Sequence, residues 1–327
     1  MQDMEQPTLS PRRNLWAFYL SLSLLAPLFF LSLVFSIFAP LPILYLHQGT
    51  DNRSHGRRWA FFASAFGILL CVLLRGLPMA GAFTTLAVLP ALLIAEILER
   101  KAPPEFAIFT AWIGVCAAII LSASLYSHLK HIDLVPFLKT QFTQSIQVMS
   151  KKLLENEKSS GSTALSEEEL KKIVENPGVL VEELPGILLA ITLVLCTLPT
   201  LAVLRWNPKG MSRRLGIPRD VWRRWKSPEW LVWPALACGV FLVFDYEPYS
   251  SVANNLLKPI LVIYFFQGMS ILAYFLDSIR IRGPIRAILY SAGILFLTPM
   301  IVSFGFFDLW FNFRGRGKKR TDGEDNL

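Results

Sequence analysis

Long apolar runs constrain the fold of this chain more than any other feature. They extend over about 16–24 residues, and a helix of that length crosses the ~30 Å hydrocarbon core of a bilayer. The chain is 53% hydrophobic and 17% charged, which leaves too little charge to cover a soluble domain. We therefore predict an all-α protein. It is a polytopic helical transmembrane bundle of about eight or nine spans with a small inserted helical hairpin.

Prolines and charged segments set the boundaries of the predicted spans. The first run, Leu15 to Leu46, is interrupted by Pro27, Pro40 and Pro42, and a proline inside a helix removes a backbone hydrogen bond. We expect one full span there, followed by a short second crossing that ends near His47. The clearer spans are Trp59–Leu74, Leu77–Leu98, Phe106–Tyr126, Ile187–Trp206, Leu231–Phe244, Leu256–Leu276 and Ile285–Phe307.

The distribution of Lys and Arg predicts the orientation in the membrane, because cytoplasmic loops are enriched in both. Arginines flank the first run on both sides, which favours an even number of crossings within it. The segment 245–255 is acidic and predicted to be external, and the segment 278–286 is basic and predicted to be cytoplasmic. Strict alternation then places the hairpin and the basic C-terminal tail outside. The tail contradicts the rule, so either the first run crosses once or the last run turns back near Thr298-Pro299.

Four parts follow from this pattern. Residues 1–127 hold the N-terminal transmembrane helices, and residues 184–313 hold the C-terminal ones. Residues 128–183 form a helical hairpin at or outside the membrane surface, with apolar residues at helical spacing from Leu134 and a second short helix that ends at Asn-Pro-Gly. Residues 314–327 are a charged disordered tail. The hairpin is too short and too thinly apolar to be an independent enzyme domain.

The basic loop between Arg205 and Glu229 contains eight Lys or Arg, two acidic residues and three Trp. It is the strongest cytoplasmic marker in the chain. Its Trp side chains suit the headgroup layer, and arginines such as Arg223 and Arg224 can meet anionic lipid. The alternative is a docking surface for a cytoplasmic partner.

The C-terminal stretch GFFDLWFNFR places Asp308, Trp310 and Arg314 among aromatic residues after the last apolar run. We interpret it as an interfacial segment in which the rings lie at headgroup depth. Asp308 and Asn312 then reach water or a helix end, and Arg314 reaches phosphate. The alternative is that Asp308 pairs with an arginine on another element and locks the C-terminus to the bundle.

Polar residues in or near spans are the candidates for binding a ligand, because they are costly in lipid unless paired or wet. They are Gln267, Asn255, Glu96 and Lys258. Gln267 stands out because it lies mid-span beside Gly268, where a backbone or a ligand can approach closely. The plainer interpretations are an interhelical hydrogen bond for Gln267 and snorkelling for Lys258.

The sequence contains no catalytic or cofactor motif. It has neither the P-loop pattern nor H-E-x-x-H nor G-x-S-x-G. The four cysteines lie in apolar runs without a CxxC neighbour, and His128 and His131 alone do not make a metal site. We therefore expect no enzymatic activity, no cofactor and no bound metal. The net charge of +8 lies in loops between spans, so we expect no nucleic-acid partner.

Four motifs in order carry a resemblance to a known family. They are APLPILYLHQGT (39–50), WKSPEWLVWPAL (225–236), NNLLKPILVIYFFQGMSIL (254–272) and GFFDLWFNFR (305–314). Over roughly residues 15–314 the chain resembles the YybS family of bacterial membrane proteins, a family without an assigned activity. The N-terminal half of that family is similar to the substrate-binding subunits of energy-coupling-factor vitamin transporters. Such subunits are six-helix bundles that hold a small ligand and rely on separate ATPase partners. This chain has about three further spans.

Two functions follow as expectations for a multi-pass protein of the bacterial cytoplasmic membrane. The first, which rests on the resemblance, is a solute-binding or transport-related component without its own ATPase. The second is a structural or assembly protein that holds partners through the hairpin and the basic loop. A small molecule bound in a cavity lined by the first six spans favours the first, and a filled, apolar bundle centre with a large exposed hairpin face favours the second. An intramembrane enzyme ranks third and needs two paired titratable groups in a cavity.

Overall fold

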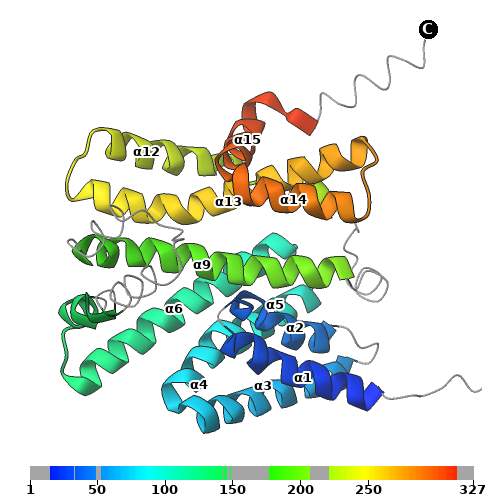
Figure 1. Cartoon of the computed structure of the whole chain (residues 1–327), viewed down its shortest axis with the longest axis vertical. Helices are drawn as coiled ribbons and strands as arrows, with labels where there is room; N and C mark the ends of the chain where they lie inside the picture. Colours follow the sequence, from blue (N-terminus) through cyan, green and yellow to red (C-terminus); the bar gives the residue numbers. More distant parts are fainter. Residues whose placement is uncertain are drawn as a thin grey trace, which may run out of the picture. The chain divides into compact units, whose positions relative to one another are not determined.

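The helices of the computed structural model correspond closely to the predicted spans (Figure 1). The structure describes residues 15–32, 34–48, 53–141, 143–145, 148, 177–206 and 221–314, and all regular secondary structure in these ranges is helical. The N-terminal helices are α1 (Leu15–Leu31), α2 (Pro40–Gln48), α3 (Arg53–Arg75), α4 (Leu77–Phe83), α5 (Leu89–Glu99) and α6 (Pro104–Lys130). The others are α9 (Pro177–Trp206), α11 (Val221–Arg224), α12 (Val232–Val243), α13 (Tyr249–Ser278), α14 (Pro284–Phe296) and α15 (Thr298–Phe311).

Five of these segments are long and apolar enough to cross a membrane, and they confirm the all-α membrane fold. They are Ser54–Arg75, Leu77–Glu99, Pro104–Lys130, Val181–Trp206 and Tyr249–Ser278. The α14–α15 pair passes the same test as one bent segment, and Trp16–Leu31 and Glu229–Val243 are shorter apolar helices. These are eight apolar segments within the described residues, but only five are straight helices of full length.

The expected second crossing in the first run is wrong. α2 ends at Gln48, close to the predicted end at His47, but it has nine residues. Such a helix rises only about 14 Å, less than half of the hydrocarbon core. Seven of its nine residues are buried, and it packs on α1, α3 and α5. α2 is therefore an inner helix. It begins at Pro40, where a missing amide hydrogen suits a helix start, whereas Pro27 lies within α1 without dividing it.

The span Leu77–Glu99 is continuous but locally widened. It starts after Gly76, whose φ of +83° makes a tight turn that an L side chain rarely adopts. Residues Thr84–Val88 form a π-helical turn. Pro90 follows, and it lacks the amide hydrogen for a regular helical bond. The local irregularity therefore has a cause in the sequence.

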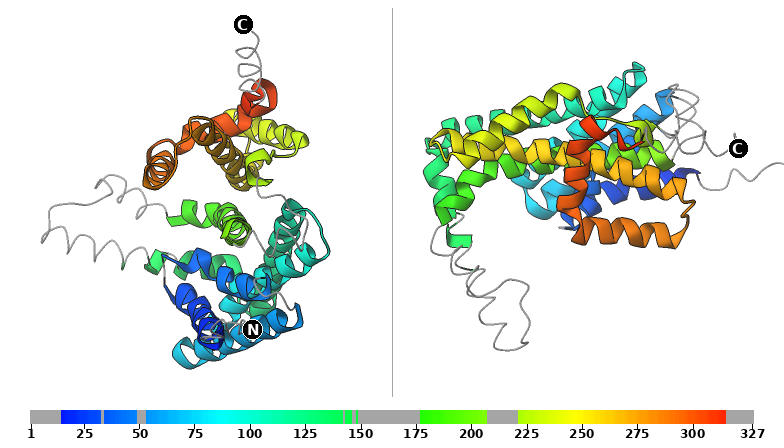
Figure 2. Two further views of the ribbon diagram at one scale, coloured as in Figure 1. Left: turned by 90° about the vertical axis from the view of Figure 1, so that its right-hand side faces the viewer. Right: turned by 90° about the horizontal axis from the view of Figure 1, so that it is seen from above.

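The last run bends where one prediction placed a turn. α14 and α15 meet at Leu297 with an angle of 94°, which the right-hand view of Figure 2 shows. Pro299 lies in the first turn of α15, where a missing amide hydrogen costs least. Residues 285–307 are therefore two helices and not one straight span.

Only the edges of the predicted hairpin lie within the described residues. Residues 134–141 are helical, in agreement with the apolar spacing from Leu134, but most of the hairpin falls outside. Its C-terminal part differs from the prediction, because α9 begins at Pro177 and continues through residue 187. The Asn-Pro-Gly sequence therefore leads into a helix, with proline near its start.

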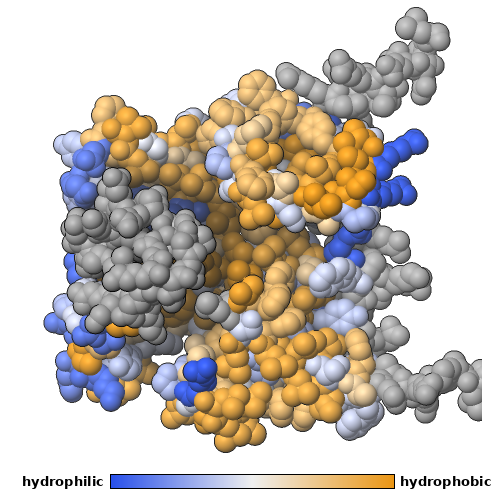
Figure 3. All heavy atoms as spheres, viewed as in Figure 1, coloured by the Kyte–Doolittle hydropathy of each residue, from blue (hydrophilic) through white to orange (hydrophobic). Residues whose placement is uncertain are grey.

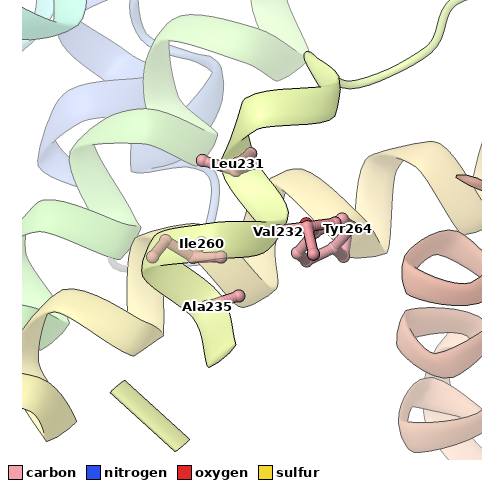
Figure 4. Close-up of a cluster of buried hydrophobic side chains, with 5 residues drawn as sticks. All are labelled: Leu231, Val232, Ala235, Ile260 and Tyr264. Carbon is pink, nitrogen blue, oxygen red and sulfur yellow. The ribbon is translucent and has the colours of Figure 1, made fainter. Parts of the chain in front are cut away.

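The chain divides into two compact units. The first comprises residues 1–115 and 195–217, and the second comprises residues 116–194 and 218–327. In the second unit a buried apolar cluster joins the start of α12 to the middle of α13. It consists of Leu231, Val232, Ala235, Ile260 and Tyr264, shown in Figure 4. The Tyr264 ring also meets Phe306 of α15 edge to face, with the ring centroids 5.2 Å apart.

α15 crosses α13 with the two backbones in direct contact. A Cβ atom on Gly268 would lie 1.9 Å from the carbonyl oxygen of Ile301, and one on Gly305 would lie 2.0 Å from that of Tyr264. Small residues allow such close approach between membrane helices. The place beside Gln267 where the sequence left room for a backbone or a ligand is therefore filled by a backbone.

Large apolar side chains cover the outer surfaces of many helices. Val243 is 81% exposed, and Leu77 and Phe296 are exposed to a similar degree. Figure 3 shows such side chains over α3 and α4 and over the α14–α15 pair. Exposed apolar surface of this extent marks contact with lipid.

Candidate functional site

A buried ion pair lies at the end of α15. Arg314 Nη2 donates to Asp308 Oδ2 at 2.8 Å, and the exposed fractions of the two residues are 9% and 1%. The backbone amide of Phe313 donates to the other carboxylate oxygen at 2.9 Å. A buried carboxylate with charged and neutral donors is a strong local link.

Arg314 also binds the segment that follows α11. Its Nη1 donates to the carbonyl oxygens of Arg223 at 3.0 Å and Trp225 at 2.8 Å. The same nitrogen lies 3.1 Å from the hydroxyl oxygen of Ser270 on α13. The Ser270 hydroxyl in turn donates to the carbonyl of Trp222 at 2.8 Å. One guanidinium thus joins three parts of the chain that are far apart in the sequence.

Gln267 completes this arrangement. Its Nε2 donates to Asp308 Oδ2 at 3.2 Å, and its Oε1 accepts from the backbone amide of Ser227 at 3.1 Å and from the Ser227 hydroxyl. The side chain is 3% exposed. We refer to Gln267, Ser270, Asp308 and Arg314 as the buried polar cluster.

The local sequence explains how Arg314 folds back. Asn312 ends α15 with a φ of +41°, and its amide bonds to the carbonyl of Asp308 at 2.9 Å. Asparagine tolerates this left-handed cap better than most residues. The reversal brings Phe313 and Arg314 back onto α15, where both reach Asp308.

The interfacial interpretation of this stretch is wrong for Arg314, which is buried and does not reach phosphate. Asp308 is also buried and does not reach water, but its carboxylate does reach a helix end, where it accepts from the amide of Phe313. The alternative is correct in that an ion pair of Asp308 ties the end of α15 to α13 and to the segment after α11. The arginine comes from the same segment and not from another element. Trp310 is 54% exposed, as expected for an interfacial ring.

Asn255 forms a second link within the second unit. Its Oδ1 accepts from the amide of Gly186 at 2.7 Å, and its Nδ2 donates to the carbonyl of Glu182 at 2.8 Å. These bonds join α13 to the N-terminal part of α9. Lys258, one turn further along α13, donates to the carbonyl of Asn254 at 3.4 Å.

Glu96 belongs to a charged group in the first unit. It pairs with Arg57 at 2.5 Å and with Arg100 at 3.6 Å. Nearby, His47 Nδ1 lies 3.3 Å from Glu99 Oε1, with both side chains almost fully buried. The sequence pattern did not single out this His–Glu pair, because the two residues lie on separate helices.

Arg223 of α11 lies beside the C-terminal end of α13. Its Nε lies 2.8 Å from Asp277 Oδ2, and Arg286 Nη1 bonds to the other oxygen. Asp277 therefore pairs with these two arginines, and the backbone amide of Arg280 donates to the Asp277 carbonyl at 3.0 Å. The side chain of Arg224 and residues 207–220 of the basic loop lie outside the described residues.

Within the described ranges, no group of three or more His, Cys, Asp or Glu residues could hold a metal ion. Cys71, Cys116, Cys196 and Cys238 form no disulfide bond. His128 and His131 are both exposed, and His131 lies beyond the end of α6 with a φ of +52°, so the two do not share a helical face.

The predicted ligand residues are thus not gathered in one place. Gln267 joins Asp308, Arg314 and Arg223 in or beside the buried polar cluster, whereas Asn255 and Lys258 lie near the other end of α13. Ser270 was missed by sequence reasoning, although its spacing of three from Gln267 puts both on one face of α13.

A family described as "Predicted membrane protein (DUF2232)" matches residues 15–309. No curated protein and no solved structure matches the chain significantly.

Proposed function

Given that the chain belongs to the DUF2232 family of predicted membrane proteins, we propose that it is a structural or assembly protein of the bacterial cytoplasmic membrane. It holds partners through the surface next to α11, where Lys226 and Trp230 are exposed. The proposal assigns it no catalytic role.

The observation that carries this proposal is that polar side chains in or near the spans form hydrogen bonds and ion pairs with other parts of the same chain. Gln267, Asn255 and Glu96 were the best candidates for binding a solute, and each bonds to other parts of the chain. A polar group in a membrane bundle that is satisfied by its own protein stabilises helix packing. The close contact of α13 and α15 at Gly268 supports a filled bundle in the second unit.

A second candidate is the solute-binding or transport-related component. It is supported by the π-helical turn at Thr84–Val88 and the 94° bend at Leu297, because interrupted helices line the solute sites of many transporters. In this case the chain needs separate ATPase subunits, as the resemblance to the YybS family and to energy-coupling-factor subunits implies.

Native mass spectrometry of the full chain, gently extracted from its own membrane, tests the two candidates. A protein retained in fixed ratio supports the assembly function. A retained metabolite, or ATPase subunits together with a metabolite, contradicts it and favours transport.

Two charge reversals sharpen this experiment. Lys226→Glu changes the proposed surface, and Lys101→Glu changes an exposed lysine after α5 as a matched control. The assembly function predicts that the first variant loses the protein partner at least tenfold and that the second keeps it. Equal retention by both variants excludes the α11 surface as the partner site.

A further inference from the structure

The turn between α13 and α14 concentrates positive charge at one end of the second unit. We refer to residues 278–286 as the basic turn. It contains Arg280, Arg282 and Arg286, and Arg223 of α11 is attached to it. Asp277 is the acidic residue among them, so four arginines share one carboxylate and leave about three positive charges in excess at neutral pH.

Two of these arginines are fixed in place by Asp277. Arg223 forms an ion pair with one carboxylate oxygen, and Arg286 donates a hydrogen bond to the other. Arg286 also donates to the hydroxyl of Tyr290 at 2.8 Å, and its guanidinium lies 5.4 Å from the centre of that ring. The turn is therefore preorganised, because the ion pairs of Arg223 and Arg286 with Asp277 restrict the side chains from which it starts.

The other two arginines are directed outward. Arg280 and Arg282 are exposed, and the chain reverses through Arg280 with a φ of +58° and Gly283 with a φ of +70°. Figure 3 shows hydrophilic side chains gathered at this end of α13 and α14. Their guanidinium groups are available to an anion that approaches from the membrane side or from water.

Exposed apolar side chains alternate with these arginines. Ile279 is 63% exposed, Ile285 is 60% exposed and Ile288 is 65% exposed. A soluble phosphate gains nothing from exposed isoleucines. A lipid does, because its acyl chains cover the isoleucines while its phosphate meets the guanidinium groups. The stacked rings of Trp222 and Trp225, with centroids 6.2 Å apart, add the aromatic side chains typical of headgroup depth.

We propose that the basic turn binds the phosphate of an anionic phospholipid through Arg280 and Arg282. The inference needs only that the chain lies in a membrane, so it stands apart from the proposed assembly function. The site differs from the basic loop between Arg205 and Glu229, from which it uses Arg223 and the Trp222–Trp225 pair.

The test compares lipids of one acyl length on the full chain. Native mass spectrometry in neutral detergent measures the ratio of bound phosphatidylglycerol to bound phosphatidylcholine. We expect the wild type to prefer phosphatidylglycerol, and Arg280→Gln/Arg282→Gln to lose about fivefold of this preference per arginine. The control, Arg75→Gln/Lys101→Gln, removes two exposed charges elsewhere and should keep the preference. The single variants Arg280→Gln and Arg282→Gln serve if the double variant does not fold.

Three results overturn the proposal. The wild type shows no preference between the lipids, or the control loses as much preference as the test variant, which indicates a general effect of net charge. The third is displacement of phosphatidylglycerol by millimolar inorganic phosphate, which identifies a soluble-anion site. Retained lipid in the presence of phosphate supports the lipid assignment.

Discussion

At the scale of single residues, the ion pair of Asp308 and Arg314 matters most, because both charges are held away from water. Removing one partner leaves the other uncompensated, which costs about 3–5 kcal/mol in buried pairs. We expect Asp308→Asn to lower the unfolding temperature of the purified protein strongly, although the side chain keeps its shape. A thermal melt in detergent measures this.

The double variant Asp308→Asn/Arg314→Gln is the matched control for this pair. Since it removes both charges, we expect it to be more stable than the sum of the single variants predicts. Strictly additive losses would show that the two side chains do not interact in the membrane protein.

Gln267 distinguishes a structural role from a ligand site. Gln267→Leu removes the bonds to Asp308 and to Ser227, and each unsatisfied buried group costs about 1–3 kcal/mol. We expect a clearly lower unfolding temperature, measured without any added solute. Ser303→Ala is the control, because the Ser303 hydroxyl is exposed and bonds only to its own helix at Pro299. An unchanged melt for Gln267→Leu would instead favour a binding role.

The sequence could predict that Gln267 and Asp308 are special, but not that they meet. A polar residue among apolar neighbours needs a partner in lipid, and that much is a local property. Which partner it finds depends on how α15 bends after Leu297 and how Asn312 reverses the chain. The interfacial interpretation of Arg314 failed for the same reason, since no local pattern shows that the guanidinium turns inward.

At the scale of helices, the crossing of α13 and α15 depends on two glycines. A methyl group at Gly268 or Gly305 would overlap a backbone carbonyl, which cannot move without shifting a whole helix. We expect Gly268→Ala to destabilise the protein by about 3 kcal/mol, near the upper end of typical overpacking costs. Thermal unfolding in detergent measures this, and Gly305→Ala should behave alike.

Gly239→Ala in α12 is the matched control, because no atom lies within 4 Å of the added methyl group. Alanine is the better helix former by about 0.5–1 kcal/mol, so this variant should be neutral or slightly more stable. A loss of stability at Gly239 equal to that at Gly268 would mean that the effect is not one of crossing geometry.

Helix positions were largely predictable, because apolar length and flanking charges are local signals. The spans around α3, α6 and α13 correspond to the predicted ones. The role of α2 was not predictable, since a short, mostly apolar segment can be an inner helix or part of a crossing, and packing on α1, α3 and α5 decides which. The bend at Leu297 was left as one of two alternatives, because a threonine and a proline permit a new helix start without requiring it.

At the scale of the whole molecule, the contacts of Arg314 favour one of the two explanations for the C-terminal tail, namely that the last run turns back. Arg314 bonds to the carbonyl of Arg223, and the Arg223 side chain bonds to Asp277 near the end of α13. α14 starts at Pro284, just after the same end. The α14–α15 pair thus leaves α13 at this end, and the residues after α15 place Arg314 beside Ser270 and the segment after α11, an arrangement compatible with a re-entrant pair. A re-entrant pair predicts that Asn312 lies on the same side of the membrane as Ser278, where the arginines indicate the cytoplasm.

This topology predicts which positions share a side of the membrane. α13 has 30 residues and rises about 45 Å, more than the hydrocarbon core, so its ends lie on opposite faces. In whole cells, an impermeant maleimide should label Tyr246→Cys directly. It should label Ser278→Cys and Asn312→Cys only after permeabilisation, since the arginines beside Ser278 favour the cytoplasm.

Labelling at Tyr246, Ser278 and Asn312 distinguishes the ways in which this topology can be wrong. Labelling of Asn312→Cys from the same side as Tyr246→Cys would make α14–α15 a true crossing and would return the tail to the outside. Labelling of Tyr246→Cys and Ser278→Cys from one side would contradict a spanning α13. If Ser278→Cys and Asn312→Cys are labelled directly and Tyr246→Cys only after permeabilisation, α13 still crosses the membrane. The positive-inside rule then gives the wrong orientation for this protein. The native cysteines do not obscure the result, because Cys71, Cys196 and Cys238 are buried and Cys116 is only partly exposed within α6.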